Sequence, residues 1–145
     1  MKLSTKGRYG VRLMIDLALH YGEGPVDLKA ISKRQGISEK YLWHLIPPLK
    51  NAGLIHSVRG ARGGYLLAHK PDQITLKDIV CLLEGSMSLV DCLSNPAACK
   101  RMQGCVTRDV WQVVTKKILE TLESFTLEAL AEKLKKKRGV FTYSI

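Results

Sequence analysis

A short basic segment rich in glycine, Arg59-Gly-Ala-Arg-Gly-Gly64, constrains the fold of this chain more than any other feature. Apolar residues flank it on both sides, in Gly53-Leu-Ile-His-Ser-Val58 and in Tyr65-Leu-Leu-Ala68. Two short apolar runs around a glycine-containing turn are typical of a β-hairpin. We therefore predict one two-stranded hairpin, within residues 53–68.

Three helices are predicted ahead of this hairpin. The first is indicated by apolar residues that share one face at helical spacing: Val11, Met14, Ile15, Ala18 and Leu19. The second is expected over residues 27–35 and ends at Gly36, because glycine readily takes the left-handed backbone conformation of a tight turn. Ser38 is expected to cap the third, which Pro47 and Pro48 should bend or distort because each removes a backbone donor.

The order of these elements indicates the fold class. Helix, short helix, glycine turn, helix and basic hairpin follow one another as in a winged helix-turn-helix domain, whose second motif helix enters the DNA major groove. We predict a mainly α fold with a small β-hairpin wing. The DNA-binding domain is expected over residues 1–78, and residues 79–145 are expected to hold a cysteine-bearing loop, a long dimerisation helix and a C-terminal tail.

The charge of the chain also favours a polyanionic partner. The sequence has 23 Lys and Arg against 13 Asp and Glu, a net charge of +10, and such a surplus favours nucleic acid or an anionic membrane surface. Residues 1–78 carry 13 basic and 6 acidic side chains, so this half is expected to meet the polyanion. The basic run at residues 133–138 is expected to be a frayed, solvated tail, and it lacks the interleaved aromatic residues of a membrane-binding segment.

Candidate DNA contacts fall on the predicted recognition helix, on the wing and just ahead of the first helix. Arg59 and Arg62 are the clearest, because a glycine-flanked turn has little structural reason to carry two arginines. Lysine and histidine side chains on the recognition helix are equally consistent with a solvated face, and Tyr41 with a core position. The complete set of candidates is Lys6, Arg8, Ser38, Lys40, Tyr41, His44, Lys50, Arg59 and Arg62.

The chain after the hairpin is predicted to be helical with one irregular interruption. Thr75 is expected to cap a fourth helix that ends at Gly85, residues 86–104 show no periodicity, and a long helix should span residues 105–124. A last short helix is expected over residues 126–134. The long helix has more apolar surface than a small neighbouring domain can cover, which predicts a homodimer contact through Trp111, Val114, Ile118 and Phe125.

Three cysteines within the irregular segment form a second candidate site. Cys92, Cys99 and Cys105 are separated by six and five residues. Thiolates are soft ligands for iron-sulfur clusters and for zinc, and an irregular loop can wrap a metal. Zinc would need a fourth donor and usually shows Cys-x2-Cys pairs, and three ordinary reduced cysteines remain the simplest alternative. Cys81, among apolar neighbours, is expected to be a small buried hydrophobe.

Other functional classes have little support in the sequence. It has no phosphate-binding loop with Gly-Lys-Ser, no His-Glu-x-x-His helix and no Gly-x-Ser-x-Gly elbow, so we do not expect an enzyme. No apolar run approaches the roughly 20 residues of a membrane-spanning helix. The N-terminal residues lack the apolar block of a secretion signal. We therefore expect a cytoplasmic protein without a membrane partner. Disulfides are rare in the cytoplasm.

Six short segments occur in the order and spacing of one known family. They are Met1-Lys-Leu-Ser-Thr-Lys-Gly-Arg-Tyr-Gly10, Gly24-Pro25, Arg34-Gln-Gly-Ile-Ser38, Tyr41-Leu42, Asn51-Ala-Gly-Leu54, and Ser57-Val-Arg-Gly60 with Gly63-Gly-Tyr-Leu-Leu67. In these segments the chain resembles the family of winged-helix transcription regulators that includes IscR, NsrR and CymR, over residues 1–132. The resemblance implies a bacterial homodimer, usually a repressor, that binds a double-stranded DNA operator.

The resemblance also bears on the cysteine loop. The spacing is similar to that of the cluster-binding members, most of all IscR, and implies an iron-sulfur cluster of the 2Fe-2S type held by three cysteines and one other ligand. The other ligand of those members corresponds to Arg108 or Arg8 here, and a guanidinium cannot ligate a metal. The fourth donor would have to come from elsewhere, with these candidates in order: Asp109, Asp91, His44 and His56.

Two further implications of the resemblance limit what can be transferred. The family also includes cofactor-free repressors that a partner protein controls, in the manner of CymR, so this alternative stays open beside the cluster-sensing regulator and a zinc-stabilised module. IscR-like members carry an acidic residue at the position of Trp43, where it helps set which operators are tolerated. The operator sequence therefore cannot be transferred to this chain.

Overall fold

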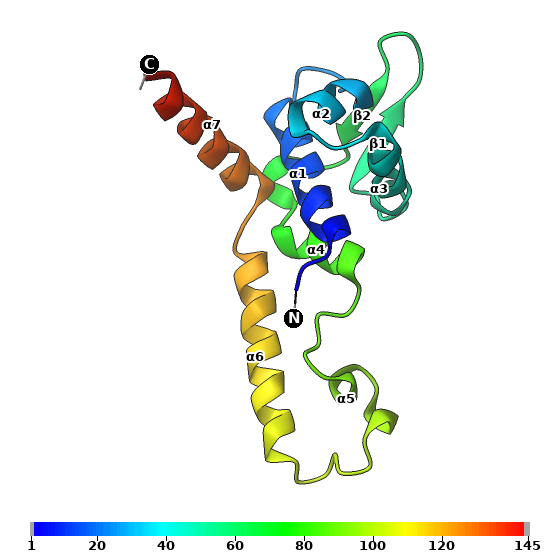
Figure 1. The fold of residues 1–145 in the computed structure, drawn as a ribbon, viewed down its shortest axis with the longest axis vertical. Coiled ribbons are helices and arrows are strands. Elements are labelled where there is room, and N and C mark those ends of the chain that lie inside the picture. Colours follow the sequence, from blue (N-terminus) through cyan, green and yellow to red (C-terminus); the bar gives the residue numbers. More distant parts are fainter. Residues whose placement is uncertain (1, 144–145) are drawn as a thin grey trace.

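The structure is a computed structural model that describes residues 2–143, with side chains for residues 2–139. It is mainly helical and has one two-stranded antiparallel sheet, which confirms the predicted fold class (Figure 1). The elements, in chain order, are α1 (Thr5–Leu19), α2 (Leu28–Gln35), α3 (Glu39–Asn51), β1 (Ile55–Val58), β2 (Gly64–Leu67), η1 (Pro71–Gln73), α4 (Leu76–Glu84), α5 (Asp91–Ser94), η2 (Pro96–Ala98), α6 (Val106–Glu123) and α7 (Leu127–Tyr143).

Helix α1 begins earlier than the sequence analysis expected. Ser4 caps it, because its side-chain oxygen accepts a hydrogen bond from the backbone N–H of Gly7 at 3.2 Å. Lys6 and Arg8 therefore lie inside the first turns of α1 and not ahead of the helix, which corrects that expectation. The apolar pattern failed to reveal this start because glycines, poor helix formers, interrupt it.

The glycines in α1 are explained by its close packing against α4. A Cβ atom at Gly7 would overlap the side chain of Glu84, and one at Gly10 would overlap that of Leu83. Glu84 also accepts hydrogen bonds from the backbone nitrogen and the hydroxyl of Ser4, at 2.9 and 2.6 Å. The first and fourth helices are thus fixed to each other at their ends.

Helices α2 and α3 form the predicted helix-turn-helix. Helix α2 ends at Gly36, whose φ of 64° lies in the left-handed region. Ser38 then caps α3, accepting from the backbone N–H of Tyr41 at 3.1 Å. Helix α3 continues through Pro47 and Pro48 to Asn51. Both predicted helices and the turn between them are therefore confirmed.

The predicted hairpin is present and is attached to the helical core. Strands β1 and β2 pair antiparallel, with Ile55 opposite Leu67. Val26 and Tyr65 exchange backbone hydrogen bonds at 2.9 Å, which joins the hairpin to the segment before α2. The side chains of Ile55, Tyr65 and Leu67 face the core, so the hairpin has one anchored face and a free turn.

The core gathers residues from both halves of the chain. Leu13, Met14 and Leu17 of α1 pack with α3 and α4, and the C-terminal helix α7 adds Leu127 and Ala131 to the same cluster. Helix α7 extends to Tyr143. The basic run at residues 133–138 is consequently helical, which corrects the expected frayed tail, although its cationic side chains are exposed as expected.

Helix α6 extends away from this body, and the segment before it runs alongside (Figure 1). It begins after Cys105 and ends before Ser124, as predicted. The intervening stretch contains two short helical turns, α5 and η2, where the sequence showed no periodicity, and α5 packs against α6. Among the described residues, no helix combines the length and the hydropathy needed to cross a membrane.

Candidate DNA-binding surface and cysteine loop

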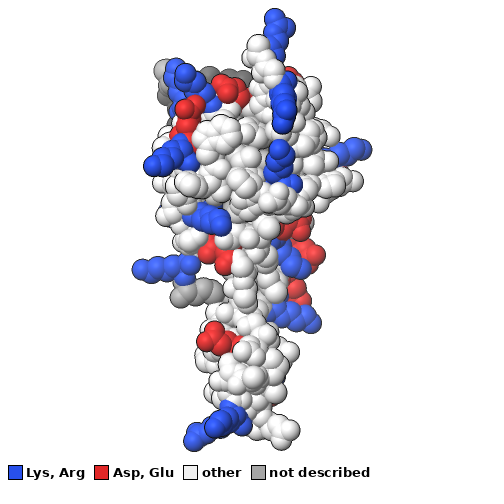
Figure 2. Space-filling model, turned by 90° about the vertical axis from the view of Figure 1, so that its right-hand side faces the viewer, with Lys and Arg blue, Asp and Glu red and all other residues white. Residues whose placement is uncertain are grey.

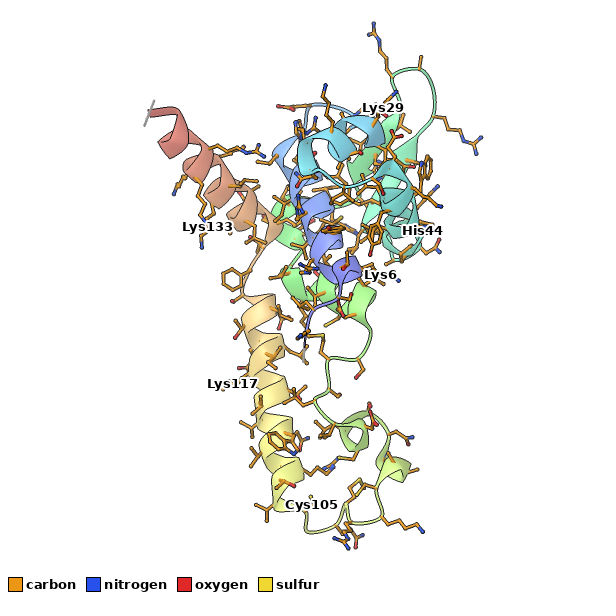
Figure 3. All side chains as sticks on the ribbon, viewed as in Figure 1. Lys6, Lys29, His44, Cys105, Lys117 and Lys133 are labelled. Atoms are coloured by element: carbon orange, nitrogen blue, oxygen red, sulfur yellow. The ribbon has the colours of Figure 1, made fainter. Side chains whose placement is uncertain are left out.

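Helix α3 presents one face to solvent beside the hairpin. Its core face carries Leu42, Leu45, Ile46 and Leu49, all buried. Lys40 and His44 lie one helical turn apart on the opposite side and are exposed. Figure 3 shows His44 on the outer side of α3. The predicted recognition helix is therefore accessible along the side that bears its polar residues.

The turn of the hairpin carries Arg59 and Arg62, both exposed. Gly60 has a φ of 116°, a conformation that favours glycine. A Cβ at Gly63 would overlap the backbone oxygen of Val58, so glycine is required for this tight turn as well. On the side that Figure 2 shows, Lys and Arg side chains outnumber acidic ones over the upper half of the molecule, which holds α3 and the hairpin.

Two of the predicted contact residues also have structural roles. The side chain of Ser38 caps α3, as described above. Lys50, near the end of α3, donates a hydrogen bond from Nζ to Oγ of Ser57 on β1, at 3.1 Å. This contact ties the recognition helix to the first strand of the wing, so the two candidate DNA-binding elements are held together.

The start of α1 lies beside the start of α3. The rings of Tyr9 and Tyr41 meet edge to face, with centroids 5.4 Å apart, and Tyr41 is half-buried. The guanidinium of Arg8 lies 6.0 Å from the centroid of the Tyr9 ring. Tyr9 thus places Arg8 near the recognition helix, with exposed Lys6 two residues earlier. Sequence reasoning did not single out Tyr9, because a lone tyrosine between glycines gives no periodic signal.

A buried acidic residue, Asp16, was also missed. Its carboxylate on α1 accepts two hydrogen bonds from Arg34 of α2, at 2.7 and 3.1 Å, and one from Nε2 of Gln35 at 2.9 Å. Its side chain is fully buried. The available signal was an aspartate inside the apolar run Met14-Ile-Asp-Leu-Ala18, since a buried charge needs a partner. This pair orients the first helix of the helix-turn-helix motif.

The three loop cysteines lie on separate short elements. Cys92 is half-buried on α5, Cys99 is exposed after η2, and Cys105 is half-buried at the N-cap of α6. All are free thiols. Across the described residues, no three His, Cys, Asp or Glu side chains are close enough to hold a metal ion together. The structure therefore places the thiols in one loop without bringing them into a ligand set.

The environments of the cysteines differ in chemistry. The hydroxyl of Thr107 lies 3.3 Å from Sγ of Cys105. This hydrogen bond, with those from the backbone N–H groups of Arg108 and Thr107, lowers the pKa of Cys105 and so favours the thiolate. Burial raises the pKa of Cys81 on α4. The contrast agrees with a structural role for Cys81. Cys81 is half-buried, however, and not fully buried as the sequence predicted.

The residues considered as a fourth ligand are scattered. Asp91 and Asp109 are exposed at the starts of α5 and α6, near the cysteines in sequence. His44 lies on α3, in the opposite half of the molecule from Cys105 (Figure 3). Arg108 has its Nε atom buried with no hydrogen-bond partner among the described residues. The described residues therefore offer no acceptor to this one donor atom of the Arg108 guanidinium.

The helix-turn-helix, the basic wing and the accessible polar face of α3 define a winged helix-turn-helix DNA-binding protein. The chain belongs to the Rrf2 family, whose model is described as an iron-dependent transcriptional regulator and matches residues 3–133. The predicted resemblance to this family is therefore confirmed.

Relatives in the family are similar over most of their length. The transcriptional regulator CymR of Bacillus subtilis is 47% identical over 131 residues, 90% of each chain. IscR of Aliivibrio salmonicida is 42% identical over 130 residues, 90% of this chain and 77% of that protein. The solved structure of T. potens IscR is 47% identical, with a TM-score of 0.78 and coverage of 94% of this chain and 90% of that one. The protein is a bacterial DNA-binding transcription regulator and not an enzyme, as predicted.

Proposed function

We propose that this protein is a homodimeric repressor that binds a near-palindromic operator through α3 and the wing. The observation that carries the proposal is the juxtaposition of an accessible α3 face with a glycine-shaped turn that exposes Arg59 and Arg62. Side chains on α3 would reach base edges in the major groove, whereas the two arginines would contact the phosphate backbone. Lys6 and Arg8, beside the start of α3, would add further backbone contacts.

The dimer is proposed to form through α6. One side of this helix leaves large apolar side chains in solvent, with Val106 75% and Val113 60% exposed. Trp111, Val114 and Phe125, predicted to be interface residues, are exposed as well, while Ile118 is half-buried. Contiguous apolar surface of this kind usually marks an interaction site. A second copy would cover it by symmetry and would place two recognition helices on one duplex.

Sedimentation of α6 variants tests the dimer. Val113→Lys should give a folded monomer at micromolar concentration, because it would bury an unpaired charge at the contact. Gln112→Lys is the matched control, since Gln112 is exposed on the same helix but points away from the apolar stripe. A stable monomer for the unmodified protein would end the proposal.

We further propose that the loop cysteines hold an iron-sulfur cluster of the 2Fe-2S type. The residues fit such a group in their chemistry, since three thiols share one loop and the lowered pKa of Cys105 favours the ligating thiolate form. The family description as iron-dependent supports an iron-containing group. When bound, the cluster would supply a redox-sensitive group, and Cys92, Cys99 and Cys105 would hold it.

The chain's own part in sensing would be positional. Cys105 directly precedes α6, and Cys92 is on α5, which packs against α6. Holding these thiols together would fix the loop relative to the proposed dimer helix. Loss of that restraint would alter the distance between the DNA-binding domains of the two copies in the proposed dimer.

Iron and sulfide content after anaerobic purification tests this assignment. Cys92→Ala, Cys99→Ala and Cys105→Ala should each lose iron, sulfide and visible absorbance. Cys81→Ala is the control and should retain them. Unchanged iron content after loss of any one of the three loop cysteines would overturn the assignment.

A second candidate is a cofactor-free repressor controlled by a partner protein. It is favoured by the separation of the three thiols, which do not converge on one point among the described residues. The relative named as the global cysteine regulator of B. subtilis shares 44% identity in its solved structure. Colourless protein without iron would favour this candidate. Stoichiometric zinc in the colourless protein would instead indicate a zinc-stabilised DNA-binding module.

A further inference from the structure

Trp43 is exposed although the helix that carries it is well packed. Its side chain is 58% exposed on α3, next to fully buried Leu42. Burying a tryptophan ring would stabilise the fold, because burial removes a large apolar area from water. Core packing therefore does not explain why this position carries the largest side chain.

The exposed ring of Trp43 contacts the wing. Trp43 meets Tyr65 of β2 edge to face, with ring centroids 6.4 Å apart and an interplanar angle of 83°. Tyr65 is buried and holds Val26 through two backbone hydrogen bonds of 2.9 Å, so the support of Trp43 does not move freely. The indole therefore has one aromatic contact, with a buried ring of the wing, and is otherwise largely open to solvent.

Trp43 also lies where a bound duplex would pass. It shares the accessible side of α3 with Lys40, three residues earlier. It lines a depression between α3 and the hairpin turn, together with Arg59 and Arg62. A duplex that contacts both α3 and the wing must run past this depression.

We propose that Trp43 is a base-reading residue that recognises thymine through its 5-methyl group. The inference rests on the proposed function, because it requires α3 to lie in the major groove. Among base-pair edges in that groove, only the thymine methyl group is apolar. The indole has one N–H donor and no acceptor, so most of its surface makes apolar contact. The basic residues around Trp43 would supply affinity, and Trp43 would supply a preference for T·A pairs.

The test compares thymine with deoxyuridine, which lacks only the methyl group. The full-length protein first selects its consensus from a duplex library of random sequence. Each thymine of the consensus is then replaced in turn by deoxyuridine, and binding is measured. At one or more positions per half-site the affinity of the unmodified protein should fall about fourfold, the effect of losing one buried methyl-sized contact.

Variants assign this difference to Trp43. Trp43→Ala should bind thymine and deoxyuridine duplexes equally, because the apolar contact is gone from both. Trp43→Phe should keep a preference for thymine, since it retains an aromatic ring beside Tyr65. Lys40→Ala is the matched control on the same side of α3: it should bind both duplexes more weakly and keep their ratio.

The outcomes separate this inference from the function on which it depends. Equal affinity of the unmodified protein for thymine and deoxyuridine at every position would overturn the role of Trp43 and leave the regulator proposal intact. A thymine preference that persists in Trp43→Ala would assign the methyl contact to another residue. This result too would overturn the role of Trp43 and leave the regulator proposal intact. Failure to select any consensus would overturn both.

Discussion

Arg34 and Asp16 form a bidentate ion pair between the first two helices. Nε and Nη2 of Arg34 donate to the two carboxylate oxygens of Asp16, at 3.1 and 2.7 Å. The hydrogen bond to Asp16 raises the pKa of Arg34, against the opposing effect of burial. Asp16 is fully buried, whereas about a third of the Arg34 side chain, 33%, is exposed. The geometry fixes α2 on α1 and therefore sets the direction in which α3 leaves the turn.

Removing Arg34 should destabilise the fold more than a surface change would. Arg34→Met leaves the Asp16 carboxylate buried with only Gln35 and His20 near it. The free energy of unfolding should fall by roughly 2–4 kcal/mol, at or below the usual figure for breaking a buried pair because Arg34 is partly exposed. Urea unfolding measures the change, and Lys33→Met on the same helix should stay within about 0.5 kcal/mol. A loss as small as that control would show that the pair is dispensable.

The wing arginines should control DNA affinity without affecting the fold. Arg59→Ala with Arg62→Ala removes two exposed cations, so the unfolding curve should not change. Specific binding should largely disappear. Each lost phosphate contact should reduce the salt dependence of binding by about 0.9 in the log-log slope. Binding isotherms at several salt concentrations check both effects, and unchanged operator affinity would remove the wing from the interface.

Much of the fold could be predicted from the sequence because local signals were strong. Ser38 and Thr75 begin helices as predicted, Thr75 within a capping box with Asp78. The start of α1 could not be predicted from periodicity, because Gly7 and Gly10 are present for contact with α4, which lies far away in sequence. Helix α7 extends beyond residue 134, and its first turns pack in the core through Leu127 and Ala131, a contact with the first half of the chain that local sequence does not reveal.

The candidate sites were less predictable than the fold. Exposed polar residues such as Lys40 and Arg59 could be chosen from helix phase and turn chemistry alone. The supports could not, because the contacts of Tyr9 with Tyr41 and of Trp43 with Tyr65 join residues 22 or more positions apart. Spacing also placed the cysteines in one loop but gave no information on whether their side chains converge.

The thiol of Cys81 should titrate at higher pH in the folded protein than in the unfolded chain. Burial raises its pKa. The fold favours the neutral thiol. The stability gained from this preference is present below the pKa of Cys81 in the unfolded chain and is lost as the pH rises through its pKa in the folded protein. Iodoacetamide labelling across a pH series, read by peptide mass spectrometry in native and urea-unfolded protein, gives both midpoints. Coincident midpoints would contradict the burial effect.

Arg108 should make the metal-free protein less stable than a variant that has an apolar side chain at this position. Its Nε is buried without a partner among the described residues, and such an atom costs about 1–3 kcal/mol. Arg108→Leu removes the donor but keeps an apolar stem, so the free energy of unfolding in the presence of a chelator should rise by about 1 kcal/mol. Arg101→Leu, an exposed arginine in the same loop, should change it by less than about 0.5 kcal/mol.

The same substitution should have the opposite effect on cofactor retention. If the loop thiols hold an anionic cluster, Arg108, three residues after Cys105, would be available to donate a hydrogen bond to it, and charge-assisted hydrogen bonds of this kind are strong. Arg108→Leu should therefore gain stability without metal and lose iron and sulfide faster under anaerobic dialysis, while Arg101→Leu changes neither. Lower stability of the metal-free Arg108→Leu protein would show that the side chain is already satisfied within the fold. Higher stability with unchanged iron retention would place its missing acceptor somewhere other than the cysteine loop.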